Sequence, residues 1–174
     1  MPGPRALLNG LAFGESPRWH DGRLWFSDVG SREVIAVDLD GNSEVIARVP
    51  GMPMGLGFLP DGNLLVVSAR DELLMRAEPG GQLATYADLT GLSGHPWSDM
   101  VIDGRGNAYV GNIGFDFPAG EFAPGILALV TPGGAARQNL RHSPNVIRRA
   151  LAQASRQRSE PASSGAKQAS DRTS

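Results

Sequence analysis

The feature that most constrains the fold is a sequence repeat with a period of about 40 residues, marked by Gly-containing turns. Gly22 and Gly62 are 40 residues apart, and so are Gly41 and Gly81. Each pair stands at one place in its unit, between short runs rich in Val, Ile and Leu. Two independent markers keep one period, which is typical of a protein built from copies of one supersecondary unit.

Short runs of about five residues between these turns predict antiparallel β-strands. The expected strands are residues 23–27, 33–38 and 43–49 in the first unit, and 63–68, 72–77 and 82–87 in the second. Residues 4–13 form an apolar lead-in that could supply one edge strand. With roughly four short strands in each unit, the sequence predicts an all-β fold of the β-propeller type, whose members close with ~4–8 blades.

The third unit is longer than the first two. Gly62 to Gly106 spans 44 residues, and Gly81 to Gly134 spans 53. The longer second spacing indicates an extra segment within residues 111–125. Insertions in a repeat form loops on one face, which is often the binding face. The sequence contains three such units, fewer than an ordinary closed ring needs.

Composition divides the chain after residue 137. Residues 1–137 contain all eleven aromatic side chains and 22 of the 23 glycines, whereas residues 138–174 contain one glycine and no aromatic residue. In the second segment Ala, Ser, Arg and Gln supply 23 of 37 residues. We therefore expect a partial propeller over residues 1–137 and a low-complexity tail over 138–174, disordered apart from one short basic helix at 145–157.

Charge divides the chain at the same place. Residues 1–137 carry 9 basic and 16 acidic side chains, a balance of −7, and residues 138–174 carry 7 basic and 2 acidic, a balance of +5. Nucleic-acid binding needs clustered Lys and Arg, so the acidic repeat region argues against a nucleic-acid partner. An acidic region fits a cation better.

The chain has no cysteine, which excludes disulfides, thiolate metal sites and a cysteine nucleophile. Its N-terminus has no apolar run typical of a signal peptide, and no stretch approaches the ~20 apolar residues of a membrane span. We expect a cytoplasmic protein with no membrane partner.

Two motifs resemble one known family. Residues 14–19, Gly-Glu-Ser-Pro-Arg-Trp, with Leu-Trp-Phe-Ser-Asp at 24–28, resemble the opening of the senescence marker protein / regucalcin / gluconolactonase family. Residues 98–111 are similar to that family's Asn-Asp segment and its following strand, and the resemblance covers about residues 10–135. It implies a six-bladed propeller, truncated after about three blades, whose complete form holds one divalent cation, calcium or zinc, at the channel mouth and hydrolyses lactones or related esters.

The resemblance also implies roles for particular residues. Glu15 matches the family's metal-ligand glutamate, and a carboxylate suits a hard divalent cation. The substrate-contacting asparagine falls on Ser98 and its neighbouring aspartate on Asp99. Pro96 stands where the family has an arginine, which puts recognition of a sugar-acid lactone in doubt.

The family's other two metal ligands lie in later blades that this sequence does not contain. Asn112 and Asp116 lie on the expected ligand face, but such residues more often serve turns. Three hypotheses follow: a metal-dependent lactone or ester hydrolase, a non-catalytic propeller fragment, and a half-propeller that assembles with a second copy. Because one carboxylate cannot hold a divalent ion tightly, the ligand count favours an inactive isolated chain.

Three blades leave two terminal sheet faces without a neighbouring blade, so we expect self-association through exposed blade edges. The apolar residues expected to lack neighbours are Val45, Ile46 and Val49 in the first unit and Leu127 and Leu129 in the third.

Deleting residues 138–174 should leave the free energy of unfolding of the repeat region nearly unchanged, because the segment has no aromatic or periodic apolar residues to bury. Urea unfolding of the deleted and full-length chains provides the measurement. Protection of residues 145–151 from hydrogen exchange at the level of residues 23–27 would contradict this prediction.

Overall fold

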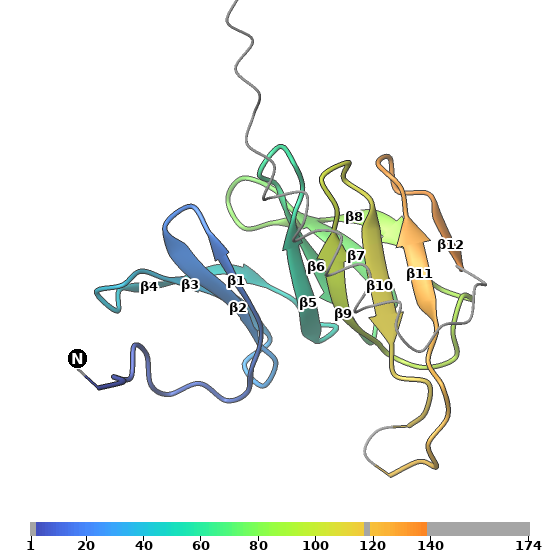
Figure 1. Cartoon of the computed structure of the whole chain (residues 1–174), viewed down its shortest axis with the longest axis horizontal. Helices are drawn as coiled ribbons and strands as arrows, with labels where there is room; N and C mark the ends of the chain where they lie inside the picture. The colour runs from blue at the N-terminus through green and yellow to red at the C-terminus, as the bar shows by residue number, and fades with distance from the viewer. Residues whose placement is uncertain (1–2, 117–118, 139–174) are drawn as a thin grey trace, which may run out of the picture.

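The computed structural model describes residues 3–116 and 119–138, which form three four-stranded antiparallel sheets (Figure 1). The first sheet contains β1 (Gly14–His20), β2 (Arg23–Asp28), β3 (Glu33–Val37) and β4 (Ser43–Arg48). The second contains β5 (Pro53–Phe58), β6 (Leu64–Ser68), β7 (Leu73–Ala77) and β8 (Leu83–Asp88). The third contains β9 (Trp97–Ile102), β10 (Ala108–Asn112), β11 (Leu127–Val130) and β12 (Ala136–Gln138). Each sheet follows chain order, as expected for propeller blades.

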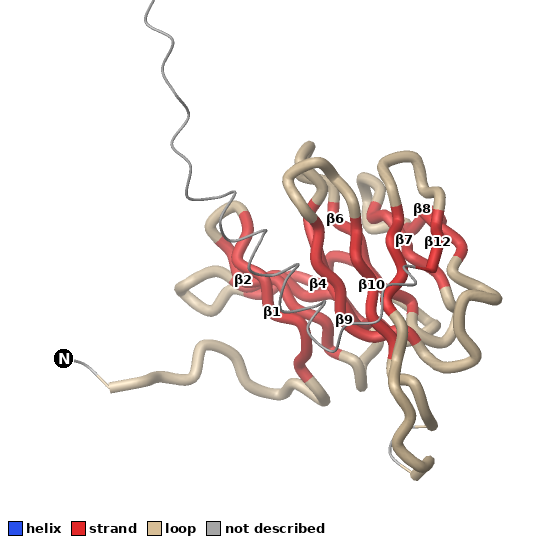
Figure 2. Tube along the Cα trace, turned by 45° about the vertical axis from the view of Figure 1, so that its right-hand side comes forward, coloured by secondary structure: helices blue, strands red, loops and turns tan. Residues whose placement is uncertain are grey.

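The predicted all-β, propeller-type fold is confirmed, and the described residues form strands and loops without a helix (Figure 2). That part of the chain accordingly holds no helix that could span a membrane. The expected domain boundary after residue 137 falls one residue before the end of β12. The helix expected at 145–157 lies outside the described residues.

The prediction of an edge strand at residues 4–13 is wrong, because no strand forms before Gly14. Pro4 has no backbone N–H to donate, and Gly10 turns the chain with a φ of 82°. The first strand of each sheet is instead a segment that the repeat pattern did not single out: β1, β5 or β9.

The 40-residue period has a direct structural basis. Gly41 and Gly81 occupy the turn between the third and fourth strands of their blades, with φ values of 90° and 79° that L side chains avoid. Leu24 pairs with Trp19 on the first strand of its blade, and Leu64, 40 residues later, pairs with Phe58 on the first strand of the next blade. Residues 40 apart therefore occupy equivalent places in the first two blades.

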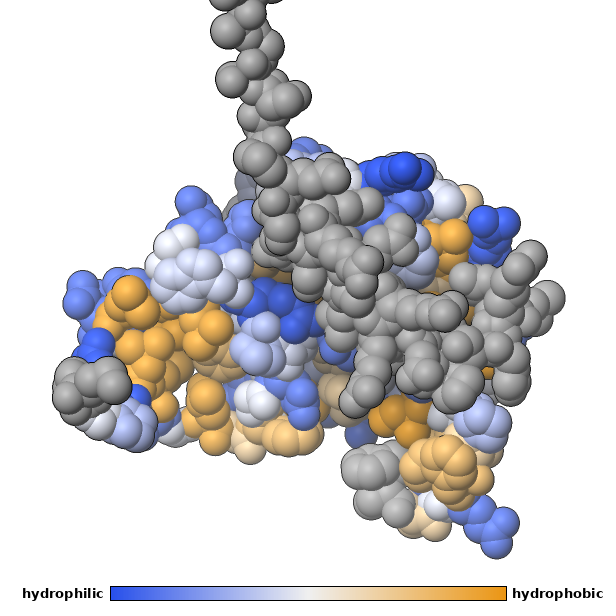
Figure 3. Space-filling view, viewed as in Figure 1, coloured by the Kyte–Doolittle hydropathy of each residue, from blue (hydrophilic) through white to orange (hydrophobic). Residues whose placement is uncertain are grey.

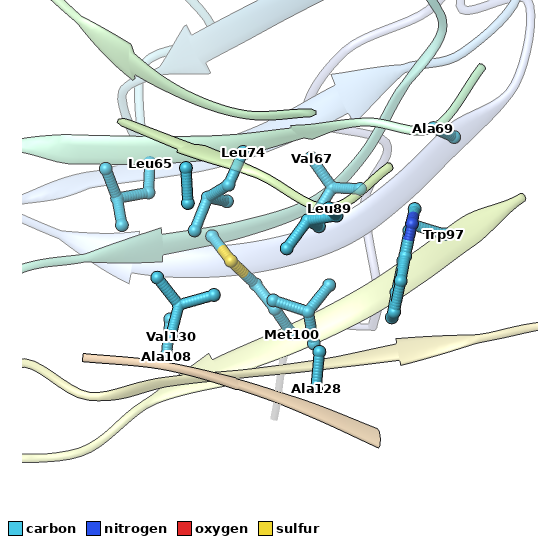
Figure 4. Close-up of a cluster of buried hydrophobic side chains, with 12 residues drawn as sticks. Leu65, Val67, Ala69, Leu74, Leu89, Trp97, Met100, Ala108, Ala128 and Val130 are labelled. Carbon is cyan, nitrogen blue, oxygen red and sulfur yellow. The ribbon is translucent and has the colours of Figure 1, made fainter. Parts of the chain in front are cut away.

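Apolar residues between neighbouring blades form the core. One cluster joins the first two blades through residues such as Val34, Val49 and Val66, and a larger one joins the second and third around Leu74 and Trp97 (Figure 4). Each of these five side chains is at most 1% exposed. Stacked blades thus bury on each other the faces that a single sheet would leave in water.

Part of the expectation about exposed edges needs correction. Val49 is 1% exposed and Ile46 packs beside it, because the fourth strand of the first blade faces the second blade. Leu127 is also buried, at 9% exposure, whereas Val45 is 44% exposed as expected. In the described chain, the face of the first blade that points away from the second blade is the one without a neighbouring blade.

That face of the first blade is covered by the N-terminal lead-in, residues 3–13. Leu7 and Leu8 pack on Phe26, Ile35 and Val37 of the first blade. The carboxylate of Asp28 accepts hydrogen bonds from the backbone N–H of Ala12 and Phe13 at 3.0 and 2.8 Å. The lead-in is therefore fastened to the end of β2.

Asp28 is 3% exposed. Burial alone raises the pKa of its carboxyl, but hydrogen bonds from Ala12, Phe13 and Ser31 outweigh burial and bring the pKa below its ordinary value of 3.8. A lowered pKa means that the ionised carboxylate stabilises the folded state above the unfolded-state pKa, and that this contribution is lost as pH falls through the folded-state pKa.

Asp28→Asn should lower the free energy of unfolding at pH 7 by about 2 kcal/mol, because the charge-assisted bonds to the lead-in are weakened. The difference from wild type should shrink as pH falls below about 4. Urea unfolding from pH 7 to pH 3 measures both effects, with the exposed Asp40→Asn as control. An equal difference at both pH values would contradict the assignment.

Candidate functional site

The first strand of every blade, which we call the inner strand, carries an irregularity at the same place. Asp28, Ser68 and Asn112 lie 40 and 44 residues apart and pair with Gly14, Pro53 and Trp97. Between these pairs and the later pairs of Arg18, Leu56 and Met100, each inner strand contains one extra residue relative to its neighbour, which is a β-bulge. In β1, Glu15 still pairs regularly with Ser27. Bulges re-aim side chains and are over-represented beside active sites.

This register places two sequence-predicted site residues at equivalent positions. Glu15 follows Gly14, Ser98 follows Trp97, and Met54 holds the same place in the second blade. The predicted metal ligand and the predicted substrate contact therefore hold equivalent positions on β1 and β9, the two inner strands on either side of β5. Glu15 and Ser98 are both half-buried, so both remain accessible.

Glu15 lies beside a mostly apolar hollow of about 270 Å³. The hollow is bounded by the lead-in on one side and by the first blade on the other, and its lining includes Leu11, Pro17 and Phe26. The Glu15 carboxylate accepts a hydrogen bond from the Ser16 N–H at 3.3 Å, which holds it near its own backbone.

The bulge residues meet across the three inner strands. Ser16 is 7% exposed with a φ of 53°, a conformation that is unfavourable for a residue with a side chain. Its hydroxyl accepts a hydrogen bond from the Leu56 N–H at 2.9 Å and donates to the Asp99 carboxylate at 3.2 Å. One hydroxyl thus connects β1 to both β5 and β9.

Gly55, the equivalent bulge residue of β5, lies between the other two. A Cβ atom at this position would lie 2.7 Å from the Met100 nitrogen and 2.9 Å from the Ser98 oxygen. Both distances are too short, so the close approach of β5 to β9 requires glycine.

Arg18 forms the most extensive polar contact of the site. Its Nε donates to the Leu56 carbonyl at 3.0 Å, while Nη2 donates to the Met100 carbonyl at 3.0 Å and to Asp99 Oδ1 at 2.9 Å. A single guanidinium from β1 therefore satisfies backbone groups of the second and third blades. Its planar, multi-donor geometry suits this task better than a lysine would.

Asp99 is placed differently from Ser98. Its Oδ1 atom accepts hydrogen bonds from Ser16, Arg18 and its own neighbour Met100, so it joins blades, although the side chain is 55% exposed. The substrate contact inferred for Asp99 stays a prediction. Sequence reasoning missed Ser16, Arg18 and Gly55; aligning the three inner strands on the repeat would have brought the bulge positions together.

Asn112 and Asp116 both serve the loop between β10 and β11, which projects beyond the sheets (Figure 1). The Asn112 amide donates to the Ser93 hydroxyl and accepts from the Ile126 N–H at 2.6 Å. Asp116 lies 3.4 Å from Nδ1 of His95. Asn112, the last residue of β10, and Asp116, in the loop itself, thus both make contacts around this loop.

The donor set does not fit a tightly held ion. Among the residues that the structure describes, no group of three or more His, Asp or Glu side chains could hold a metal. Calcium takes 6–8 oxygen ligands and catalytic zinc three protein ligands. The part of the inner strands that carries Glu15 and Ser98, which we call the mouth, presents one carboxylate at Glu15 and a hydroxyl at Ser98.

The fold and the bulged inner strands define a three-blade portion of a propeller with a polar inner-strand mouth. The family model of the SMP-30/gluconolactonase/LRE-like region matches residues 13–147, well over half of the sequence. The chain belongs to this family. No protein of curated function matches the sequence.

Solved structures support the same fold. A gluconolactonase from Xanthomonas campestris superposes with a TM-score of 0.64 at 18% identity, over 76% of this chain and 48% of the other. A calcium-binding regucalcin from Agrobacterium tumefaciens gives 0.60 at 24% identity, over 75% and 43%. A putative gluconolactonase gives 0.62 at 21% identity, over 77% and 50%. The chain thus spans about half the length of these relatives.

Arg18→Met should lower the free energy of unfolding by about 3 kcal/mol, because carbonyls of two other blades lose their donor. Urea unfolding measures the loss. Arg23→Met is the matched control: its side chain is also 29% exposed, but its hydrogen bonds stay within the first blade, so about 1 kcal/mol is expected. Equal losses for the two variants would contradict the role of Arg18 in joining blades.

Proposed function

We propose that this chain carries part of the channel mouth of a lactone or ester hydrolase of the gluconolactonase type. The observation that carries the proposal is the equivalent position of Glu15 and Ser98 on two inner strands, each beside the β-bulge of its strand. Family membership and the resemblance of the fold to gluconolactonases support it.

In this proposal Glu15 supplies one carboxylate oxygen to a divalent cation, calcium or zinc, and Ser98 hydrogen-bonds a substrate oxygen. Once further ligands complete its site, such an ion would supply Lewis-acid chemistry toward a lactone carbonyl and a bound water. The frame of Ser16, Arg18 and Asp99 fixes the strands that present both groups. The proposed substrate is a small lactone or ester.

The isolated chain is proposed to be inactive, because its described residues do not complete an ion site. The alternative is a partial propeller with no catalytic role, in which Glu15 is only a strand residue beside the bulge. The two hypotheses differ in whether Glu15 contacts a cation. Contact through a single carboxylate is weak, but it affects residues near Glu15 and can be detected there.

Millimolar calcium or zinc should shift the backbone amide signals of Glu15, Ser16 and Ser98 in a nuclear magnetic resonance titration. These shifts should disappear in Glu15→Gln and persist in Glu44→Gln, whose side chain is 64% exposed within the first blade. Shifts that are absent, or equal in wild type and Glu15→Gln, would exclude the proposed role of Glu15.

Hydrolysis of aldonolactones by the purified chain should not exceed the buffer rate with calcium, zinc, manganese or magnesium. A pH-stat assay measures the rate, with Glu15→Gln as the comparison. Hydrolysis by a verified monomer that Glu15→Gln abolishes would show that the mouth is complete within this chain.

A further inference from the structure

We infer that two copies of this chain pair head to tail: the lead-in of each copy adds as a strand to the β11 edge of the other, and its first blade packs on the partner's third blade. The inference stands on the blade contacts alone and is independent of the proposed catalysis.

The lead-in already occupies the place of an outer strand. The carbonyl of Ile46, at the bulge of β4, lies over Gly81 of the second blade, 2.7 Å from where a Cβ would be. The carbonyl of Tyr86, 40 residues later at the bulge of β8, lies in the same way over Gly134 of the third blade. Over Gly41, the equivalent glycine of the first blade, lies the carbonyl of Leu7, at 3.1 Å.

The space under the lead-in corresponds to an unfilled blade interface. The first blade presents Leu24, Phe26, Ile35 and Val37 on this side. Their equivalents 40 residues later, Leu64, Val66, Met75 and Ala77, pack on apolar residues of the preceding blade. Within the part of the chain that the structure describes, the lead-in covers this face of the first blade, and the hollow of about 270 Å³ lies between them. Apolar side chains of the first sheet and the lead-in gather on this side of the molecule (Figure 3).

The third blade offers a matching edge. Among the described residues β12 takes this edge and pairs with Ala128, Leu129 and Val130 of β11, so the incoming lead-in takes the place of β12. Within the third blade, Leu127 pairs with Gly111 as Val34 pairs with Ser27 in the first.

A second copy fits because it repeats an interface that the chain makes twice. The first and second blades of this chain each lay the carbonyl of their fourth-strand bulge over a turn glycine of the next blade. The first blade of a second copy brings the same elements to the third blade: a turn glycine, an apolar face and, in Leu7, the bulge carbonyl. Two such contacts, related by a two-fold axis, leave neither terminal face open.

The register of the pairing follows from these equivalences. Leu7 takes the place of Ile46, so Leu8 takes the place of Ala47, which pairs with Val34. Because Leu127 is the equivalent of Val34, Leu8 of one copy should lie opposite Leu127 of the other. A disulfide between cysteines at these two positions would report the pairing.

The test mixes two single variants, Leu8→Cys and Leu127→Cys, under mild oxidation, because the native chain has no cysteine. A disulfide-linked heterodimer on a non-reducing gel is expected. The control replaces Leu8→Cys with Leu39→Cys, which is 60% exposed in a first-blade turn and should not cross-link. Thermal unfolding of each variant confirms that it is folded. Absence of the Leu8–Leu127 cross-link, or equal cross-linking in the control, would overturn the inference.

Sedimentation of the native chain at micromolar concentration should show dimers. Gly41→Ala should weaken the dimer at least tenfold, because its methyl group displaces the Leu7 carbonyl. Gly80→Ala provides the matched control, since its φ of 88° resembles the 90° of Gly41 but nothing lies near its Cβ position. A monomer, an assembly larger than a dimer, or equal weakening by both variants would each overturn the pairing.

Discussion

The guanidinium of Arg18 is the interaction on which the arrangement of the three blades depends. Blades of a propeller touch mainly through non-directional apolar contacts, which tolerate sliding. Arg18 adds directional bonds from the first inner strand to carbonyls of the second and third, and to a carboxylate of the third. The Ser16 hydroxyl, two residues before Arg18, also connects the first inner strand to the other two: it accepts from the Leu56 N–H and donates to the Asp99 carboxylate. The level of Glu15 relative to Ser98 is therefore set by hydrogen bonds.

The apolar core and the hydrogen bonds of Ser16, Arg18 and Asp99 contribute to the structure in different ways. Residues such as Val34, Val66 and Leu74 bury area between sheets and supply most of the favourable free energy. Gly55 lets β5 approach β9 closely enough for the frame to form. Asp28 plays a comparable part at the periphery, since its carboxylate fixes the end of the lead-in against the first blade.

The blades could be predicted from sequence because Gly41, Gly81 and the short apolar runs repeat at fixed spacing. The inner strands could not, because β1 contains Pro17 and β5 contains two glycines, which weaken the alternation that marks a strand. The resemblance of the motifs to the family identified Glu15 and Ser98 as candidate site residues, and the strand pairing shows that they hold equivalent positions. The bond between Arg18 and Asp99 joins residues 81 positions apart, and no local pattern encodes such a pair.

Because a bulge recurs in every inner strand, the three blades share one backbone arrangement but carry different side chains at the equivalent position. The position that follows Gly14, Pro53 and Trp97 holds Glu in one blade, Met in the next and Ser in the third, and a bulge lies beside it in each inner strand. Each blade therefore presents one side chain at this position, and that side chain differs from blade to blade. Substitution at these three positions alone can change the charge and hydrogen-bonding character of the mouth while the hydrogen-bonded sheets remain as they are.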